Sequence, residues 1–287
     1  MGNLLDGKIV SNNIKLQLKQ NCEKLLKLYN IVPKLAIVLV GNDPASMVYV
    51  ASKEKSCEMV GINSITLRLP ETISQEQLEE EVLKLANDKN INGLMVQLPL
   101  PKGLNEKLVL NCIPPEKDVD GLTVLSGGAC FYSQKGFVPC TPRGIMELLK
   151  AYEVDIMGKH AVVVGRSNMV GKPIAMKLLE ANATVTICHS KTPDLGLITR
   201  QADILVVAVG KKHLITEDMV KEGSVVVDVG INRIDGKLYG DVDFEAVKPK
   251  TSLITPVPGG VGLMTVAMLL SNTFDACLAQ NGIENEF

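Results

Sequence analysis

Short apolar runs that end in glycine or in a polar loop recur along this chain, and segments with helical spacing separate them. In the first half, the runs are KLAIVLVG (34–41), NSITLRL (63–69) and GLMVQLPL (93–100). In the second half, they are KHAVVVG (159–165), ATVTICHS (183–190), DILVVAVG (203–210) and SVVVDVGIN (224–232). Strands that alternate with helices predict an α/β fold, and parallel strands buried on both faces have continuous apolar sequences. Right-handed crossovers place the carboxyl ends of such strands at one edge, where we expect the site.

The length of the chain predicts two α/β domains. With 287 residues, 46% of them hydrophobic, it can bury two cores of ordinary size. The stretch 112–142 is rich in proline and glycine and lacks a sustained period, so we place the interdomain crossing near its end. We predict a domain with a parallel sheet over 1–140 and a Rossmann-like, doubly wound domain over 141–262, with a cleft between them. Helices are expected at 12–29, 45–61, 74–88, 143–152 and 263–280, and the C-terminal segment 263–287 is expected to pack back on the first domain.

Charge and cysteine content exclude several classes of protein. Thirty basic and 32 acidic residues give a formal net charge of -2, which offers no electrostatic footprint for nucleic acid or for an anionic membrane. Seven cysteines without a Cys-x-x-Cys pair favour reduced thiols in a cytoplasmic protein, and three isolated histidines lack the spacing of a metal site. We therefore predict no metal. We also expect no signal peptide and no apolar run near the ~20 residues that cross a bilayer.

Tyr49 and Lys53 are separated by one helical turn within VGNDPASMVYVASKEK. On a helix over 45–61, both side chains leave the same face and can meet one ligand. The spacing is similar to the Tyr-x-x-x-Lys dyad of short-chain reductases, but in those enzymes the dyad follows the glycine-rich loop. Here it precedes any nucleotide-binding signal by about a hundred residues, so a different catalyst is predicted. The alternative is an ordinary surface lysine on an amphipathic helix.

A glycine turn, GRSNMVGKP at 165–173, follows one predicted strand and opens a predicted helix. This is the context of a dinucleotide-binding turn, in which free amides and the helix dipole bind a pyrophosphate. Ser167 stands in place of the middle glycine, so a merely structural turn is the alternative. The next strand ends in Ser190 and Lys191 rather than in the carboxylate that NAD enzymes use, and Arg166 adds a planar cation. These residues favour NADP over NAD, unless Arg166 and Lys191 are only solvated surface charges.

Four further stretches end predicted strands or bridge them: VQLPLP (96–101), PPEKDVDG (114–121), PCTPRG (139–144) and PVPGGVG (256–262). Each alone has a structural explanation, such as a satisfied core amide, a polar turn or a loop that needs positive φ. Together with VGNDPASxxYVxxK and GRSxxVGKP, in this order, they make the chain closely resemble the bifunctional methylenetetrahydrofolate dehydrogenase/cyclohydrolase family known as FolD. The resemblance covers residues 1–280.

The resemblance implies a two-step reaction of one-carbon metabolism. NADP-dependent oxidation of 5,10-methylenetetrahydrofolate gives the 5,10-methenyl cation, and hydrolysis in the same cleft gives 10-formyltetrahydrofolate. It also implies a homodimer, a folate-binding catalytic first domain and an NADP-binding second domain. The positions that match the family's folate site are Tyr49, Lys53, Gln97, Leu98, Pro99, Asp120, Pro258, Gly259, Gly260 and Val261. Those that match its NADP contacts are Thr141, Gly165, Arg166, Ser167, Ser190 and Ile231.

Four of these residues, Tyr49, Lys53, Gln97 and Asp120, are predicted to act in the chemistry. Hydride transfer requires mainly orientation, with Tyr49 along the folate body and Asp120 accepting hydrogen bonds from the pterin. Hydration requires a base or a proton relay. Lys53, held by Gln97, is the candidate because burial and the like charge of the methenyl cation both lower its pKa. A protonated Lys53 would instead donate protons or stabilise charge, and the sequence leaves both roles open.

Two positions depart from the family pattern. Leu263 replaces a proline after PGGVG, and Lys212 stands where the family tends to have proline. Neither change removes a proposed catalytic group. Two other functions remain as alternatives: a monofunctional NAD(P)-dependent methylenetetrahydrofolate dehydrogenase, and a non-catalytic NADP-binding scaffold. The presence of Lys53 and Gln97 argues against both.

Overall fold

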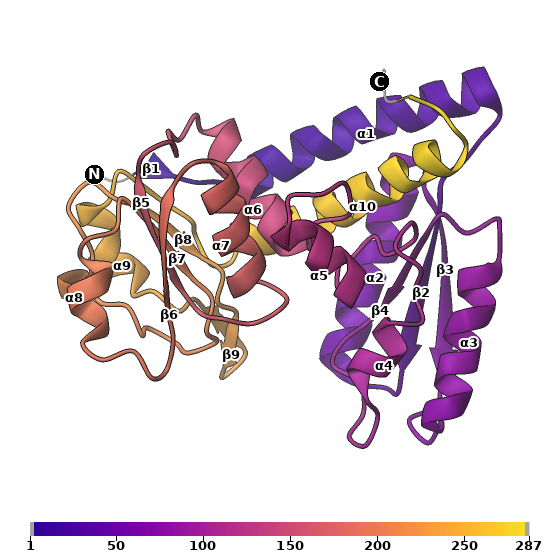
Figure 1. Ribbon diagram of the computed structural model, residues 1–287, viewed down its shortest axis with the longest axis horizontal. Helices are drawn as coiled ribbons and strands as arrows, with labels where there is room; N and C mark the ends of the chain where they lie inside the picture. The colour runs from indigo at the N-terminus through magenta and orange to yellow at the C-terminus, as the bar shows by residue number, and fades with distance from the viewer. Residues whose placement is uncertain (1–2, 285–286) are drawn as a thin grey trace. The chain divides into compact units, whose positions relative to one another are not determined.

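The chain folds into two units, each built on a parallel sheet (Figure 1). The computed structural model describes residues 3–284 and residue 287. The three-strand unit comprises residues 13–140 and the described residues from 266 onward. The six-strand unit comprises residues 3–12 and 141–265. The predicted two-domain α/β class with parallel sheets is confirmed.

The sheet of the three-strand unit has the order β3-β2-β4, and its pairings are parallel. Its strands are β2 (Lys34–Val40), β3 (Asn63–Leu69) and β4 (Gly93–Val96). Side chains of β2 alternate between two apolar cores. Odd-numbered residues from Leu35 to Leu39 lie in one core, and even-numbered residues from Ala36 to Val40 lie in the other. Because both faces of β2 are covered, its sequence is apolar without interruption.

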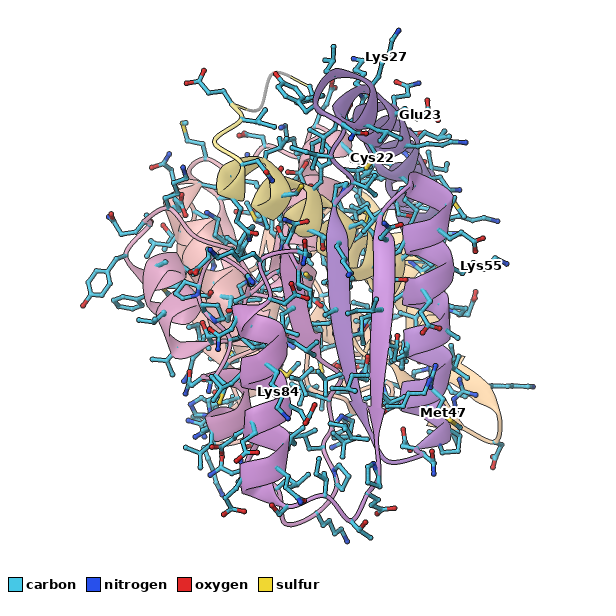
Figure 2. The ribbon with its side chains drawn as sticks, turned by 90° about the vertical axis from the view of Figure 1, so that its right-hand side faces the viewer. Cys22, Glu23, Lys27, Met47, Lys55 and Lys84 are labelled. Carbon is cyan, nitrogen blue, oxygen red and sulfur yellow. The ribbon has the colours of Figure 1, made fainter. Side chains whose placement is uncertain are left out.

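The helices of this unit are α2 (Pro44–Val60), α3 (Gln75–Asn87), α4 (Glu106–Leu110) and α5 (Val124–Phe131), with parts of α1 (Gly7–Tyr29) and α10 (Val261–Gln280). Figure 2 shows the sheet with α2, which carries Lys55, and α3, which carries Lys84. Val50 of α2 packs in the core of the odd-numbered β2 residues, and Val82 of α3 packs in the other. These two helices therefore cover opposite faces of the sheet.

Local sequence determines where α2 and α3 begin. The Asp43 carboxylate accepts a hydrogen bond from the Ser46 amide at 2.7 Å, and Pro44 occupies the first turn, where a missing N–H costs nothing. Ser74 and Gln77 form a capping box at the start of α3, in which each side chain accepts from the other residue's amide. Both predicted helices lie within one residue of their expected ends.

The sheet of the six-strand unit has the order β1-β11-β8-β7-β5-β6, again with parallel pairing. Its strands are β1 (Asn3–Leu4), β5 (His160–Val164), β6 (Thr184–Cys188), β7 (Ile204–Val207), β8 (Val225–Asp228) and β11 (Leu253–Ile254). The order of strands reverses between β5 and β7. In doubly wound sheets, ligands bind outside the carboxyl ends of the strands at such a reversal.

Connections in this unit are mostly short helices. They are α6 (Cys140–Ala151), α7 (Gly171–Glu180), α8 (Leu195–Thr199) and α9 (Phe244–Val247), with 3-10 turns at Glu217–Met219 and Lys248–Lys250. An antiparallel hairpin, β9 (Asn232–Ile234) with β10 (Lys237–Tyr239), follows β8. The core is aliphatic, with Val162, Leu205 and Val226 from the central strands among its members.

The N-terminal segment differs from its prediction. The helix expected over 12–29 begins at Gly7, because the Asp6 carboxylate caps it by accepting hydrogen bonds from the amides of Lys8 (2.8 Å) and Ile9 (3.2 Å). Ahead of the helix, β1 pairs with β11. Residues 3–12 therefore lie in the six-strand unit, and not in a domain that spans 1–140.

Two further boundaries are wrong. The strand expected over 93–100 ends at Val96, because Pro99 and Pro101 have no N–H with which to extend the ladder. The stretch 112–142, expected to be irregular, contains α5. The Thr123 hydroxyl caps this helix by accepting from the Ser126 amide at 3.1 Å.

Helix α10 corrects the expectation that no segment has the length and apolarity of a membrane span. Its 20 residues pass that test by length and composition. However, 67% of its most apolar window is buried, and Phe274 and Leu270 lie in the core of the three-strand unit. We therefore identify α10 as a core helix of this fold.

Candidate functional site

Lys53 and Gln97 meet in the three-strand unit. Helix α2 carries Tyr49 and Lys53 one turn apart, and Gln97 follows directly after β4. The Lys53 Nζ donates a hydrogen bond of 2.7 Å to the Gln97 Oε1. The Gln97 Nε2 donates to the Leu98 carbonyl oxygen, also at 2.7 Å. Because that carbonyl accepts only, the amide oxygen must face Lys53, and either charge state of the amine can donate to it.

Burial controls the charge of Lys53. Removal of the amine from water lowers the pKa of Lys53, and the negative charge of Asp120 opposes this shift. Burial also raises the pKa of Asp120, and the positive charge of Lys53 opposes that shift in turn. Desolvation thus favours the neutral form of each group, whereas their mutual attraction favours the charged forms. An amine in this setting gives up its proton more readily than an exposed lysine does.

The two aspartates of the DVDG motif have different roles. The Asp118 carboxylate accepts hydrogen bonds from the amides of Gly121 (3.0 Å), Leu122 (3.1 Å) and Thr123 (2.9 Å), so it holds the turn. Asp120 interacts instead with the Lys53 charge and with the side chain of Cys140. The sequence alone offered a polar turn as one explanation for both residues. The contacts assign that structural role to Asp118.

Tyr49 and the 256–262 loop carry no charged side chain, so they can contribute only uncharged contacts to a ligand. The Tyr49 side chain is 47% exposed, which leaves its ring open to a planar ligand. Gly260 and Val261 are buried, whereas Pro258 is exposed. The Leu263 amide, in the first turn of α10, donates to the Gly260 carbonyl at 3.3 Å. A proline at 263 has no N–H for this bond, so the departure from the family pattern adds a hydrogen bond inside the loop.

The glycine turn between β5 and α7 lies at the carboxyl end of β5, beside the reversal of strand order. Gly165 has φ +132, and a Cβ there would lie 2.3 Å from the Ala208 carbonyl oxygen, so this position requires glycine. The Ser167 Oγ accepts from the amides of Val170 (3.2 Å) and Gly171 (3.3 Å). Ser167, in place of the middle glycine, therefore holds the turn that leads into α7, whose N-cap residue is Val170. The close backbone approach and a helix N-terminus fit the pyrophosphate of a dinucleotide.

The remaining predicted cofactor contacts belong to the same six-strand unit. Arg166 and Ser190 are exposed, and they follow β5 and β6 respectively. Ile231 follows β8 and is 46% exposed. The Thr141 and Thr265 hydroxyls share a hydrogen bond of 3.0 Å. Thus Arg166, Ser190 and Ile231 lie after the carboxyl ends of parallel strands, as the topology predicted.

Sequence reasoning missed two carboxylates in the same unit, Asp228 and Asp241. Both are buried, at 3% and 0% exposure. The available signal was the acidic residue that ends the apolar run VVVD. Within residues 3–284 and 287, no group of three or more His, Cys, Asp or Glu side chains is placed to hold a metal ion.

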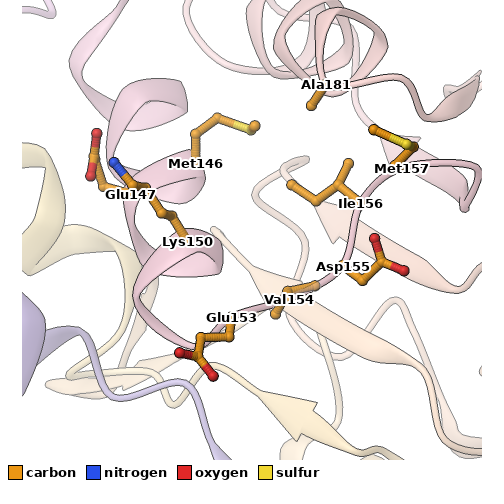
Figure 3. A pocket seen from close by; sticks show the side chains of 9 residues that line it. All are labelled: Met146, Glu147, Lys150, Glu153, Val154, Asp155, Ile156, Met157 and Ala181. Carbon is orange, nitrogen blue, oxygen red and sulfur yellow. The ribbon is translucent and has the colours of Figure 1, made fainter.

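A separate open pocket lies in the six-strand unit (Figure 3). Met146, Ile156 and Met157 contribute apolar side chains to it, and Glu147 and Lys150 extend from α6. None of the nine lining residues is a predicted site residue. The pocket does not correspond to either set of site residues described above.

Comparisons with known proteins match one family over nearly the whole chain. A family profile described as "Tetrahydrofolate dehydrogenase/cyclohydrolase, catalytic domain" matches residues 5–120, and its "NAD(P)-binding domain" counterpart matches residues 139–281. A "Bifunctional protein FolD" of Streptococcus agalactiae is 51% identical over 279 residues, which are 97% of this chain and 98% of that protein.

Solved structures give the same result. The crystal structure of the bifunctional enzyme FolD from Campylobacter jejuni has a TM-score of 0.95 at 51% identity, and the match covers 97% of this chain and 99% of that chain. The Trypanosoma brucei dehydrogenase-cyclohydrolase, in complex with NADP cofactor and inhibitor, has a TM-score of 0.93 at 36% identity. That match covers 97% of this chain and 98% of the other.

Proposed function

Because this chain belongs to the tetrahydrofolate dehydrogenase/cyclohydrolase family, we propose that Lys53 carries the hydrolytic half of its reaction. The protein is a bifunctional, NADP-dependent enzyme of one-carbon metabolism. It oxidises 5,10-methylenetetrahydrofolate to the 5,10-methenyl form, and it hydrolyses that product to 10-formyltetrahydrofolate.

The observation that carries the proposal is the hydrogen bond between Lys53 and Gln97 beside Asp120. In the hydrolysis, water adds to the carbon between two folate nitrogens, and the neutral Lys53 amine accepts one proton of that water. One carbon–nitrogen bond then breaks as the added hydroxyl loses its remaining proton and becomes the carbonyl of the formyl group on the other nitrogen, and the released nitrogen takes up a proton. The bound methenyl cation and burial both favour the neutral amine, and Gln97 fixes its position.

For the oxidation, NADP when bound supplies the hydride acceptor. The protein's part is orientation. We assign pyrophosphate binding to Gly165 and Ser167, recognition of the ribose phosphate to Arg166 and Ser190, and further cofactor contacts to Ile231 and Thr141. By the family resemblance, the folate is assigned to the following residues: Tyr49, Lys53, Gln97, Leu98, Pro99, Asp120, Pro258, Gly259, Gly260 and Val261.

We further propose that the enzyme is a cytoplasmic homodimer. The family resemblance and the free thiols of the described cysteines support this assignment. Light scattering coupled to size exclusion, at several protein concentrations, tests the dimer. A monomeric mass at concentrations that support full activity would contradict it.

The experiment for Lys53 compares Lys53→Met with Lys55→Met. Lys55 is exposed on the same helix, two residues away, so it serves as a matched control. We expect Lys53→Met to lose cyclohydrolase activity by roughly 100-fold or more, the contribution expected of a proton acceptor, while NADP-dependent dehydrogenase activity stays measurable. Lys55→Met should retain both activities. Equal loss of both activities in folded Lys53→Met would refute the assignment.

A further inference from the structure

Asp228 and Asp241 form a hydrogen-bonded brace within the six-strand unit. Asp228 ends β8, and Asp241 follows β10. The Asp228 Oδ1 accepts from the amides of Gly230 (3.0 Å) and Asp241 (2.9 Å), and its Oδ2 accepts from the Val242 amide (2.9 Å). The carboxylate of one aspartate thus holds the backbone of the other.

Two glycines make this arrangement possible. A Cβ at Gly240 would lie 1.8 Å from the Asp228 Oδ2, and a Cβ at Gly230 would lie 2.2 Å from the Asp241 Oδ1. The Asp228 carboxylate therefore packs against Gly240, which precedes Asp241. The Asp241 carboxylate packs against Gly230, which lies two residues after Asp228. The motifs Asp228-Val-Gly230 and Gly240-Asp241 fit together reciprocally, and neither glycine position has room for a side chain.

Asp241 also fixes the loop that follows β7. Its Oδ2 accepts from the amides of Val209 (2.7 Å) and Gly210 (2.9 Å), and its Oδ1 accepts from the Lys211 amide (2.7 Å). Successive amides that converge on one carboxylate hold a loop in a single conformation. The Oδ1 also accepts from the Asn232 side chain at 2.9 Å, which ties in the segment after β8.

These loops border the proposed cofactor residues. Ala208, directly before the braced amides, presents the carbonyl that lies against Gly165 of the glycine turn. Ile231 lies between Gly230 and Asn232, both of which are held by the aspartates. The brace therefore determines the backbone next to two predicted dinucleotide contacts, although neither aspartate is exposed to a ligand.

We propose that Asp241, supported by Asp228, is a positioning residue for the dinucleotide, because it fixes the loop after β7, which lies against Gly165, and the loop after β8, which contains Ile231. The inference rests on the proposed function in one respect, namely that these loops contact NADP. Hydrolysis of the methenyl compound consumes no NADP, so the cyclohydrolase activity serves as an internal reference for folding.

The experiment compares Asp241→Asn with Asp203→Asn. Asp203 is a matched control, since it also accepts a backbone hydrogen bond, from the His160 amide at 2.9 Å, but at the amino ends of β5 and β7.

In Asp241→Asn, an amide N–H₂ must face backbone N–H donors, so we expect the loop to shift. The KM for NADP and the dissociation constant for NADPH, measured by fluorescence, should rise roughly 10- to 100-fold. Cyclohydrolase kcat/KM should stay within about twofold. In Asp203→Asn, the melting temperature should fall while NADPH affinity is kept.

Unchanged NADPH affinity in folded Asp241→Asn would overturn the inference, as would an equal loss of affinity in Asp203→Asn. If Asp241→Asn does not fold, Asn232→Ala decides, because it removes the side-chain bonds to Asp241 and to the Tyr239 carbonyl and leaves the three amide bonds to Asp241. A severalfold weaker NADPH affinity in Asn232→Ala supports the inference, and wild-type affinity overturns it. Substitution of Arg166 tests the cofactor turn independently. Binding that is lost in Arg166→Ala but kept in Asp241→Asn contradicts the brace and leaves the proposed function standing.

Discussion

At Asp228, burial and hydrogen bonding act in opposite directions on one carboxyl group. The pKa of Asp228 is raised to about 7: burial and the charge of Asp241 raise it, whereas the backbone amides of Val242, Asp241 and Gly230 lower it. Burial is the largest of these effects. This carboxyl therefore gains or loses its proton close to neutral pH, unlike an exposed aspartate.

The raised pKa gives Asp228 a predictable influence on stability. In the unfolded chain the group titrates near ~3.9, so between about pH 4 and 7 the folded state binds more protons than the unfolded state. The contribution of Asp228 is complete below pH 4 and is lost as pH rises through 7. We expect the difference in unfolding free energy between wild type and Asp228→Asn, measured by urea denaturation, to change by roughly 2–4 kcal/mol across this range. Parallel stability profiles would contradict the raised pKa.

We propose that Arg166 selects NADP over NAD. Its planar guanidinium is exposed in the glycine turn, where the anionic oxygens of a ribose 2′-phosphate can pair with it. We expect Arg166→Ala to raise the KM for NADP roughly 10- to 100-fold, as the loss of a charge-assisted hydrogen bond predicts, and to change the KM for NAD little. Lys177→Ala removes a positive charge from the last turn of α7 and should leave both constants unchanged. An unchanged ratio of the two KM values in Arg166→Ala would contradict the assignment.

Among the elements, α2 carries two of the four proposed catalytic residues, Tyr49 and Lys53. The hydrogen bond from the Ser46 amide holds the pKa of Asp43 below its usual range, as expected of a carboxylate that caps a helix. The first turn of α2 therefore depends on Asp43, and the position of Lys53 depends on α2.

Capping variants separate stability from positioning. Ser74→Ala removes the cap of α3 and should destabilise the protein by about 1 kcal/mol without changing cyclohydrolase kcat, because α3 carries no proposed site residue. Asp43→Ala should also lower the melting temperature, and in addition it should lower cyclohydrolase kcat severalfold because α2 frays near Lys53. Thermal melts and steady-state assays measure both effects. The same kcat in both variants would show that the start of α2 does not position Lys53.

Elements with strong local signals could be predicted from the sequence, and others could not. The apolar pattern located β2, α2 and α3 within one residue, and in the structure Asp43 and Ser74 cap the two helices. Helix α5 was missed because Gly127 and Gly128 have low helix propensity, although Thr123 was an available cap signal. Strand β1 has two residues, too few for any period, and only its pairing with β11 defines it.

In the candidate site, too, features with a local sequence signal could be predicted, and contacts between distant residues could not. The spacing of Tyr49 and Lys53 was visible in the sequence, but the contact of Lys53 with Gln97 joins residues 44 positions apart. Only the family resemblance brought those two residues together in advance. The bonds from the amides of Asp241 and Val242 to Asp228 depend on how the segment after β10 lies against the end of β8. No local pattern encodes such a register, so this network required the structure.

On the scale of the whole molecule, helices rather than loops carry the chain from one unit to the other. Residues 12 and 13, at the first passage, lie inside α1, and residues 265 and 266, at the last, lie inside α10. Residues 140 and 141 are the first two of α6. Each unit is therefore assembled from segments that are distant in sequence.

Removal of the last segment tests this organisation. A truncation after Thr265 deletes Phe274 from the core of the three-strand unit, and it deletes Asn272, whose Nδ2 donates to the Val119 carbonyl at 2.7 Å, next to Asp120. We expect cyclohydrolase activity to disappear while NADPH still binds, because the strands of the six-strand unit all precede residue 255. A truncation after Gln280 keeps α10 and should keep both functions. Full cyclohydrolase activity in the shorter protein would contradict this expectation.

The pairing of β1 with β11 has a consequence for the nascent polypeptide. The partners Asn3 and Leu253 are 250 positions apart, and a ribosome that adds about 5–20 residues per second needs roughly 10–50 s to make the intervening chain. Throughout that interval the N-terminal strand has emerged from the exit tunnel without its partner. This sheet edge therefore closes only after Leu253 and Ile254 have been synthesised, and until then Asn3 and Leu4 are a candidate substrate for ribosome-associated chaperones.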